Sequence, residues 1–450
     1  MDAARTNYHS QAVATDSSID QVWQRLLRHA GKTRTPHFRM DATTLAPLRR
    51  TLRGLGEPQK ALRIVHIAGS KGKGSTAFYL ERLLLAHGQQ VATFTSPHLQ
   101  HWRERFRIGG VPAADQPLLQ AAQRLQEALA TQPDARELRF FDLLTAIAMT
   151  LFARTPLDWV LLETGVGGRF DATNVVQPAL CILTRLELEH CDVLGDSLAE
   201  IAAQKAGIIK PATPVICAAM PRDARDVVTR AARAVAAPLM QSGDAFKHDS
   251  VRTGSTTWRV TYQGQNTLTF DLAAGAPALI ENAALALAAY ETLGLKADPQ
   301  AVARTFTRAL PARCEFLPGV PGILLDAAHT PASFHALRNA IDAIPHRRRH
   351  FLVGCSSERH MHELMRLFEN ADRVVVTRAD THYTVAPETL WRAVRLAHPS
   401  LEVARRSDVT QALSAAADGL GEQDLLCITG STYLAGRARA LLIDRSTAAP

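Results

Sequence analysis

Residues 66–78, HIAGSKGKGSTAF, bring together residue types that suit phosphate binding. Closely spaced glycines let backbone N–H groups converge on an anion, and a helix that starts there adds its positive end. Lys73 would reach the outer phosphates, and Ser75 or Thr76 would bind magnesium through a hydroxyl. The spacing is shorter than in the common GxxxxGK[ST] loop, and the alternative is a glycine turn at the surface. The residues expected to contact ATP here are Gly69, Gly72, Lys73, Gly74, Ser75 and Thr76.

Lysine is rare in this chain, because only eight of its 51 basic residues are lysine. Four of the eight lie in two short stretches, GSKGKGS and KAGIIK. Where positive charge alone is needed, the chain uses arginine, so a retained lysine indicates a need for a compact ammonium or a reactive amine. We expect Lys73 to contact phosphate, Lys71 to be solvated, and Lys205 to have a chemical role of its own.

A carboxylate follows another predicted strand. Glu163 ends the apolar run DWVLLE, and the carboxyl end of a strand beside a phosphate loop is a suitable place for a magnesium ligand. The alternative is a salt bridge at the end of the strand.

The elements that must position these residues follow an alternating pattern. Short apolar runs, typical of buried strands, alternate with helical segments such as 75–86 and 140–153, which indicates parallel sheets with helices on both faces. At 450 residues, two domains are expected. We predict an α/β fold in which a domain with a mostly parallel central sheet covers 1–308 and a smaller α/β domain covers 309–450. The predicted strands are 63–68, 90–96, 158–165, 178–186, 214–219, 322–328, 350–355, 372–378 and 424–430.

The composition is that of an ordinary globular protein, with 46% hydrophobic and 21% charged residues. Residues 1–18 are polar and lack the apolar core of a secretory signal, so we expect a frayed tail. No apolar run is long enough to span a membrane. The net charge of +8 is spread along the chain, and the densest basic run, 346–350, is expected to be a solvated turn. We therefore expect no nucleic-acid partner.

The six cysteines are scattered and form no CxxC pair. This usage favours reduced, mostly buried thiols in a cytoplasm over a disulfide framework or a zinc site.

Four longer motifs occur in order along the chain: HIAGSKGKGS (66–75), FTSPHL (94–99), ETGVGGRFDATNVV (163–176) and EHCDVLGDSLAEIAAQKAGIIKP (189–211). Together they resemble the folylpolyglutamate synthase/dihydrofolate synthase family of the Mur ligase superfamily, over roughly residues 40–440. The resemblance implies a P-loop ATPase domain followed by a Rossmann-like domain that binds an amino acid.

The resemblance also implies a reaction. ATP would phosphorylate a (dihydro)pteroate or folate carboxylate to an acyl phosphate, which the amino group of glutamate would then attack. The family's cofactors are ATP and Mg²⁺, two ions being expected, and its members suggest a cytoplasmic monomer.

Site residues carry over by position. Lys73, Glu163, His190 and Lys205 match catalytic positions, and the matching family lysine of Lys205 is carbamylated, which requires a primary amine. The implied magnesium ligands are Ser75, Ser96, Glu163, His190 and carbamylated Lys205. In the second domain, the implied ATP contacts are Asn282, Arg313, Asp326 and His329. The implied acid-substrate residues are Phe140, Phe141, Arg169, Asp171 and Ala172. Plain core packing of the two phenylalanines is the alternative.

The chain departs from the family in three places. Ala278 and Leu279 stand where the family has His-Gln near the adenine, and the metal segment reads TRLELEH, with Glu189 in place of an aspartate. The family's Asp-Lys-Asp near the amino-acid site is Glu-Arg-His at 358–360. We therefore expect glutamate to be used weakly or held by different residues, with Arg359 and His382 as candidates.

Two other functions remain open at this stage. The chain could be a paralogue that joins an amino acid to a different carboxylic acid, or a non-catalytic protein that binds ATP or folate. The joint retention of Lys73, Glu163, His190 and Lys205 argues against the second.

Overall fold

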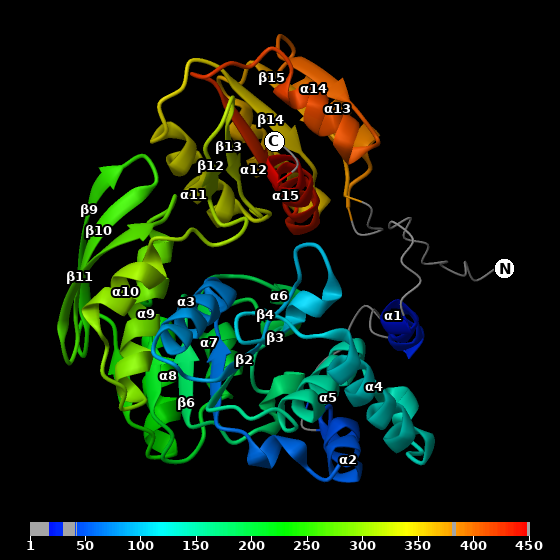
Figure 1. Cartoon of the computed structure of the whole chain (residues 1–450), viewed down its shortest axis with the longest axis vertical. Coiled ribbons are helices and arrows are strands. Elements are labelled where there is room, and N and C mark those ends of the chain that lie inside the picture. The colour runs from blue at the N-terminus through cyan, green and yellow to red at the C-terminus, as the bar shows by residue number, and fades with distance from the viewer. Residues whose placement is uncertain (1–17, 30–40, 42, 380–383, 448–450) are drawn as a thin grey trace. The chain divides into compact units, whose positions relative to one another are not determined.

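The computed structural model describes residues 18–29, 41, 43–379 and 384–447 (Figure 1). Within these ranges the chain forms two compact units, which are described separately. The first takes the described residues up to Pro97, together with Arg103–Lys247 and Leu285–Ala297. The second takes His98–Trp102, His248–Ala284 and the described residues from Asp298 onward. The predicted tail at residues 1–17 lies outside the described residues.

The first unit is built on one sheet of eight strands, in the order β4-β3-β2-β5-β1-β6-β7-β8. The inner strands β2, β5, β1, β6, β7 and β8 pair in parallel, while β3 and β4 add an antiparallel edge next to β2. The predicted mostly parallel sheet is therefore confirmed. Its strands are β1 (Ile64–Ala68), β2 (Val91–Phe94), β3 (Phe106–Ile108), β4 (Val111–Pro112), β5 (Trp159–Glu163), β6 (Leu180–Leu183), β7 (Val215–Cys217) and β8 (Leu239–Gln241).

The central strands of this sheet are apolar along their whole length because both faces are covered. Every residue of β1, β2, β5, β6 and β7 is buried. The strands are parallel, so their carboxyl ends meet at one edge, where the loops that follow β1, β2, β5 and β6 are neighbours. The helices of this part of the chain are α1 (Ser18–His29), α2 (Ala46–Gly54), α3 (Lys73–Ala86), α4 (Asp115–Ala130), α5 (Phe140–Phe152), α6 (Cys191–Leu194), α7 (Leu198–Ala206) and α8 (Arg222–Ala234).

The second unit contains a sheet of six strands, in the order β12-β13-β17-β14-β15-β16, of which only β12 is antiparallel to its neighbour. Alternate residues of each inner strand enter different cores. Phe351 and Val353 pack with α11, α12 and α13, whereas Leu352 packs with α14 and α15. This confirms the predicted C-terminal α/β fold. The strands are β12 (Glu315–Leu317), β13 (Gly322–Leu325), β14 (Arg349–Val353), β15 (Arg373–Val376), β16 (Glu402–Arg405) and β17 (Leu425–Thr429).

Helices and a small sheet complete the second unit. The antiparallel strands β9 (Lys247–Gly254), β10 (Thr257–Gln263) and β11 (Thr267–Ala273) form a separate sheet, and α10 packs on β11 (Figure 1). The sequence analysis did not predict this sheet. The helices are α9 (Ala278–Thr292), which continues into the first unit, α10 (Pro299–Phe306), α11 (Pro331–Asp342), α12 (Met361–Met365), α13 (Pro387–Ala397), α14 (Val409–Ala417) and α15 (Thr432–Thr447).

The basic run at 346–350 differs from the expected solvated turn. Its last two residues, Arg349 and His350, are buried in β14. The guanidinium of Arg349 donates to the carbonyls of Glu369 and Asn370, and His350 Nδ1 lies 2.8 Å from the Ala416 carbonyl. These partners let the polar groups begin a buried strand.

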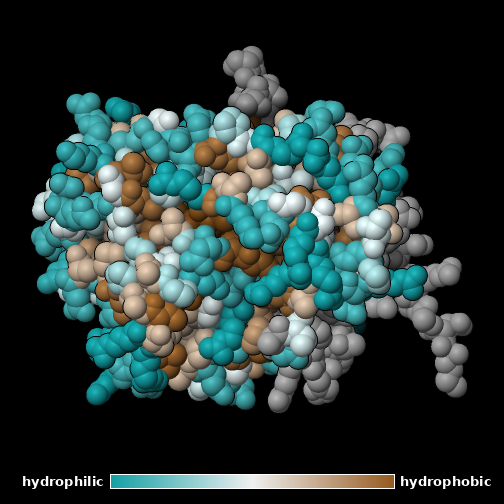
Figure 2. Space-filling view, turned by 90° about the horizontal axis from the view of Figure 1, so that it is seen from below, coloured by the Kyte–Doolittle hydropathy of each residue, from teal (hydrophilic) through white to brown (hydrophobic). Residues whose placement is uncertain are grey.

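All six cysteines are unpaired and five of them are buried, as expected for mostly buried thiols. No helix among the described residues is long and apolar enough to cross a membrane. On the face drawn in Figure 2, apolar residues are interspersed with hydrophilic ones.

Candidate active site

The loop after β1 has a backbone that only glycine allows at its first position. Gly69 has φ +154, and a Cβ there would lie 1.8 Å from Thr184 Oγ1, at the end of β6. The loop therefore runs in direct contact with the neighbouring strand end. Gly72, with φ +88, then turns the chain into α3, which begins at Lys73.

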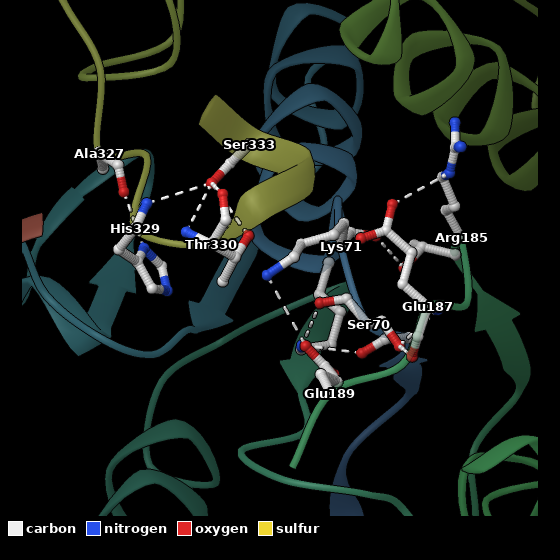
Figure 3. Close-up of polar contacts among 12 residues, drawn as sticks. Ser70, Lys71, Arg185, Glu187, Glu189, Ala327, His329, Thr330 and Ser333 are labelled. Atoms are coloured by element: carbon white, nitrogen blue, oxygen red, sulfur yellow. Dashed lines mark hydrogen bonds and ion pairs between the residues drawn. The ribbon is translucent and has the colours of Figure 1, made fainter. Parts of the chain in front are cut away.

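The segment after β6 holds this loop in place. The N–H groups of Ser70 and Lys71 donate to the Arg185 carbonyl, at 2.9 and 3.2 Å. The Ser70 hydroxyl exchanges hydrogen bonds with the Glu187 backbone, both at 3.0 Å (Figure 3). Thr184 Oγ1 donates to the Lys71 carbonyl at 2.6 Å. The loop is thus fixed before any nucleotide binds.

The two lysines of the loop have different surroundings. Lys73 Nζ is turned back over the loop and donates to the Gly69 carbonyl at 2.9 Å. Lys71 has a side chain that is 31% exposed, and its Nζ lies 3.8 Å from Glu189 Oε2 (Figure 3). The ammonium of Lys73 therefore lies over the glycine loop at the start of α3, where the positive end of the helix favours a phosphate.

Lys205 is the most deeply buried cation of this site. Its side chain is 1% exposed, and Nζ donates at 2.9 Å both to Glu189 Oε1 and to the Gly69 carbonyl. Lys205 lies in the last turn of α7, and from there its side chain reaches the phosphate loop. The helix begins with a capping box formed by Ser197 and Glu200. Burial and the charge of Lys73 lower the pKa of Lys205 to about 8, although Glu189 opposes the change.

Glu189 is a residue of the site whose role the sequence analysis missed, since the residue appeared there only as a departure from the family. Its carboxylate lies between two lysines, Lys205 and Lys71. Burial opposes its ionisation, but Lys205, Lys73 and Lys71 outweigh burial and lower the pKa of Glu189. One indication of this role was present in the sequence: an acidic residue stands next to His190, in a site for which several lysines were predicted.

Glu163 lies at the end of β5, against the start of α3. Its Oε2 accepts the Ser96 N–H at 2.9 Å and lies 3.5 Å from where a Cβ on Gly74 would stand. Ser75, 5% exposed, follows Gly74 in the first turn of α3. The strand ends therefore bring Glu163, Ser96 and the phosphate loop together.

These oxygen donors suit magnesium bound together with a nucleotide. In the described part of the chain, no group of three or more His, Cys, Asp or Glu side chains could hold a metal by itself. Mg²⁺ is commonly bound by one or two carboxylates plus substrate phosphates. Glu163 and the Ser75 hydroxyl fit that manner of binding.

His190 directly follows Glu189 and is exposed, with φ +47, immediately before the short helix α6. The left-handed backbone is uncommon for a residue with a side chain. His190 is thus the chain neighbour of Glu189, which pairs with Lys205. The role of His190 as a magnesium ligand stays a prediction.

The segment predicted to contact the acid substrate forms a tight turn after β5. The buried Asp171 carboxylate accepts the N–H groups of Gly165, Val166 and Thr173, each within 3.0 Å. Burial raises the pKa of Asp171, although bonds from Thr173 and Val166 oppose this. Ala172 is also buried. The Asp171 carboxylate is therefore occupied in shaping the loop.

This turn also packs against the helix that carries Lys205. The Arg169 N–H donates to the Gln204 carbonyl at 2.7 Å, and a Cβ on Gly207 would lie 2.4 Å from the Arg169 Cβ. The Arg169 side chain itself is exposed. Phe140 and Phe141 are half-buried at the start of α5, and the Phe141 ring lies 5.6 Å from that of Phe94.

In the second unit, Asp326 and His329 follow β13, and Arg313 directly precedes Cys314, which bonds to Asp326. The buried Asp326 accepts the N–H groups of Cys314 and Ala328, at 2.6 and 2.7 Å. Burial raises the pKa of Asp326, while Arg313 opposes it. His329 Nδ1 lies 2.8 Å from the Ala327 carbonyl, just before α11 (Figure 3).

The remaining predicted residues of the second unit are less well defined. Asn282 is 5% exposed on α9, and Arg359 is exposed in the short helix at 358–360. His382 lies outside the described residues. The predicted amino-acid site is therefore represented only by Arg359.

Known proteins resemble this chain in sequence and in fold. Residues 312–432 match the family model described as "Mur ligase, glutamate ligase domain". The chain is 32% identical over 302 residues to the dihydrofolate synthase/folylpolyglutamate synthase of Bacillus subtilis, covering 63% of this chain and 69% of that relative. It is 29% identical to the corresponding protein of Mycobacterium tuberculosis, covering 95% of both.

Solved structures resemble the whole chain. The M. tuberculosis folylpolyglutamate synthase complexed with ADP and AMPPCP superposes with a TM-score of 0.83 and 26% identity, over 94% of this chain and 98% of that one. E. coli FolC in complex with DHPP and ADP superposes with a TM-score of 0.82 and 25% identity, over 97% and 100%.

Proposed function

Because the chain belongs to the folylpolyglutamate synthase/dihydrofolate synthase family, we propose that it joins a (dihydro)pteroate or folate carboxylate to glutamate. The chain is an ATP-dependent ligase. The observation that carries the proposal is the convergence of Lys73, Lys205 and Glu163 on one glycine loop at the carboxyl edge of the sheet.

The chemistry has two steps. A carboxylate oxygen of the acid attacks the γ-phosphorus of ATP, and ADP leaves. The amino group of glutamate, having lost a proton, then attacks the acyl carbon and displaces phosphate. The N–H groups of the loop and the Lys73 ammonium bind the phosphates and offset the charge of the transferring group.

Mg²⁺ would be held by Ser75 and Glu163, with Ser96, His190 and a carbamylated Lys205 as further ligands. It would neutralise charge on the transferring phosphoryl group. Carbamylation requires an unprotonated amine, and the pKa of about 8 at Lys205 makes that form more abundant at neutral pH than for an ordinary lysine. A carbamate would replace the present contact of Lys205 with Glu189.

The remaining assignments belong to the same proposal. The ATPase part would comprise residues 1–308 and the amino-acid-binding part residues 309–450. Nucleotide contacts in the second unit would come from Asn282, Arg313, Asp326 and His329. We propose Phe140, Phe141 and the turn at 169–172 for the acid substrate, and Arg359 with His382 for the amino acid. The protein would act as a cytoplasmic monomer.

The test is a substrate panel. ADP release is measured with dihydropteroate, folates and unrelated carboxylic acids, each combined with glutamate or another amino acid. The proposal predicts ADP release over many turnovers only when a pteroyl acid and glutamate are both present. Release with an unrelated acid would favour the paralogue, and no release with any pair would favour a non-catalytic protein.

A further inference from the structure

A second basic site lies in the first unit, away from the phosphate loop. It is an open cavity of about 640 Å³ lined by residues from α2, from 57–60, from 174–177 and by Lys210. These segments precede β1, β6 and β7, whereas the phosphate loop follows β1. Since β1 has five residues at about 3.3 Å each, roughly 16 Å separates the cavity from the loop, at opposite edges of the sheet.

The lining of this cavity carries excess positive charge. Glu57 is its one acidic residue, and that carboxylate already pairs with Lys60 at 2.5 Å. Arg49, Arg53 and Lys210 form no ion pair with any carboxylate in the part of the chain that the structure describes. Burial lowers the pKa of the half-buried Lys210, and the charge of Arg49 adds to this. Three cations that converge without an acidic partner favour an anionic ligand.

Hydrogen-bonding groups refine the chemistry of that ligand. Lys210 Nζ is fixed by a 2.7 Å bond to Asn174 Oδ1, and Asn174 is itself anchored through Nδ2 to the carbonyls of Arg169 and Gly207. Guanidinium and ammonium groups donate several hydrogen bonds to the oxygens of a phosphate group, so a small oxyanion is the ligand that suits this lining.

We propose that this cavity is a second anion site, which binds a small phosphate-bearing molecule independently of ATP. The proposal goes beyond the ligase function and does not rest on it.

The experiment is a calorimetric titration of the full chain saturated with AMPPCP, so that the phosphate loop is occupied. Inorganic phosphate is the probe, and sulfate is the competitor. The expected result is one saturable site for phosphate, at which sulfate competes because it presents the same tetrahedral oxygens to the cations. Arg53→Gln and Lys210→Met should each weaken phosphate binding by at least about fivefold.

The matched control is Arg230→Gln, which removes an equal charge from an exposed arginine of α8 outside the cavity and should bind phosphate as the wild type does. Because Arg53 is exposed, its substitution leaves the fold intact and keeps the test decisive if Lys210→Met does not fold. The proposal is overturned if phosphate shows no saturable binding, or if Arg53→Gln binds it as tightly as the wild type.

Discussion

Lys73, Lys71 and Lys205 lie close to the same loop but have different surroundings and different roles. The Lys73 ammonium lies at the glycine loop, Lys205 is buried behind it, and Lys71 remains partly exposed. Arginine, which the chain uses almost everywhere else, has neither the compact charge nor the reactive amine that these positions require.

Lys73→Ala should lower the rate of ATP turnover at saturating ATP by at least about a hundredfold, because the side chain bonds only to the loop and would stabilise the transferring phosphate. The circular dichroism spectrum should not change. Lys247→Ala, at an exposed lysine of β9, is the control. A variant rate near that of the wild type would remove Lys73 from the phosphate site.

Glu163→Ala should lose activity to a similar degree, and added magnesium should restore part of it if the carboxylate acts by binding metal. The measurement is the initial rate of ADP release over a range of magnesium concentrations. If the fraction of activity lost does not depend on magnesium, Glu163 acts only through its hydrogen bond with Ser96.

Lys205→Arg should be as inactive as Lys205→Ala, although it keeps the positive charge, because a guanidinium cannot be carbamylated. Initial rates with and without bicarbonate test this, and short carboxylic acids should restore some activity to the alanine variant only. Substantial activity of Lys205→Arg would show that the residue serves as a cation paired with Glu189.

The elements that carry these residues depend on close contacts between neighbouring loops. Gly69→Ala should weaken ATP binding at least about tenfold, because its Cβ would overlap Thr184 Oγ1 and its φ is unfavourable for alanine. Calorimetric ATP titration measures the effect. Gly254→Ala, with no neighbouring atom nearer than 3.7 Å, should bind normally. Unchanged ATP affinity of Gly69→Ala would show that the loop tolerates displacement.

Much of this element framework follows from the sequence, because strands buried on both faces are apolar throughout. That pattern predicted β1, β5, β6 and the inner strands of the second unit. The sheet of β9, β10 and β11 was missed, because β9 alternates between exposed and half-buried residues and contains little apolar surface. The Lys205–Glu189 pair was also missed, since spacing along the chain does not show which loops meet.

At the scale of the whole molecule, stability should depend on His66, which is fully buried in β1. Burial, together with the charge of Lys210, lowers the pKa of His66 to about 3. The folded state therefore binds fewer protons than the unfolded state between pH 6.5 and pH 3. Stability from this group is complete above pH 6.5 and decreases as pH falls, by roughly 5 kcal/mol in total.

Thermal unfolding of wild type and His66→Asn between pH 7.5 and pH 4.5 measures this contribution. As pH falls, the unfolding midpoint of the wild type should decrease more than that of His66→Asn. A difference that stays constant with pH would show that His66 does not titrate on unfolding.

The central claim is that ATP activates the carboxylate of the acid substrate before glutamate attacks. The most direct measurement uses dihydropteroate or a folate whose carboxylate carries ¹⁸O, incubated with ATP, magnesium and glutamate, followed by mass spectrometry of the released phosphate. An acyl phosphate passes one carboxylate oxygen to phosphate, so the account predicts that one ¹⁸O appears in each phosphate released during amide formation. Amide product accompanied by unlabelled phosphate would contradict it.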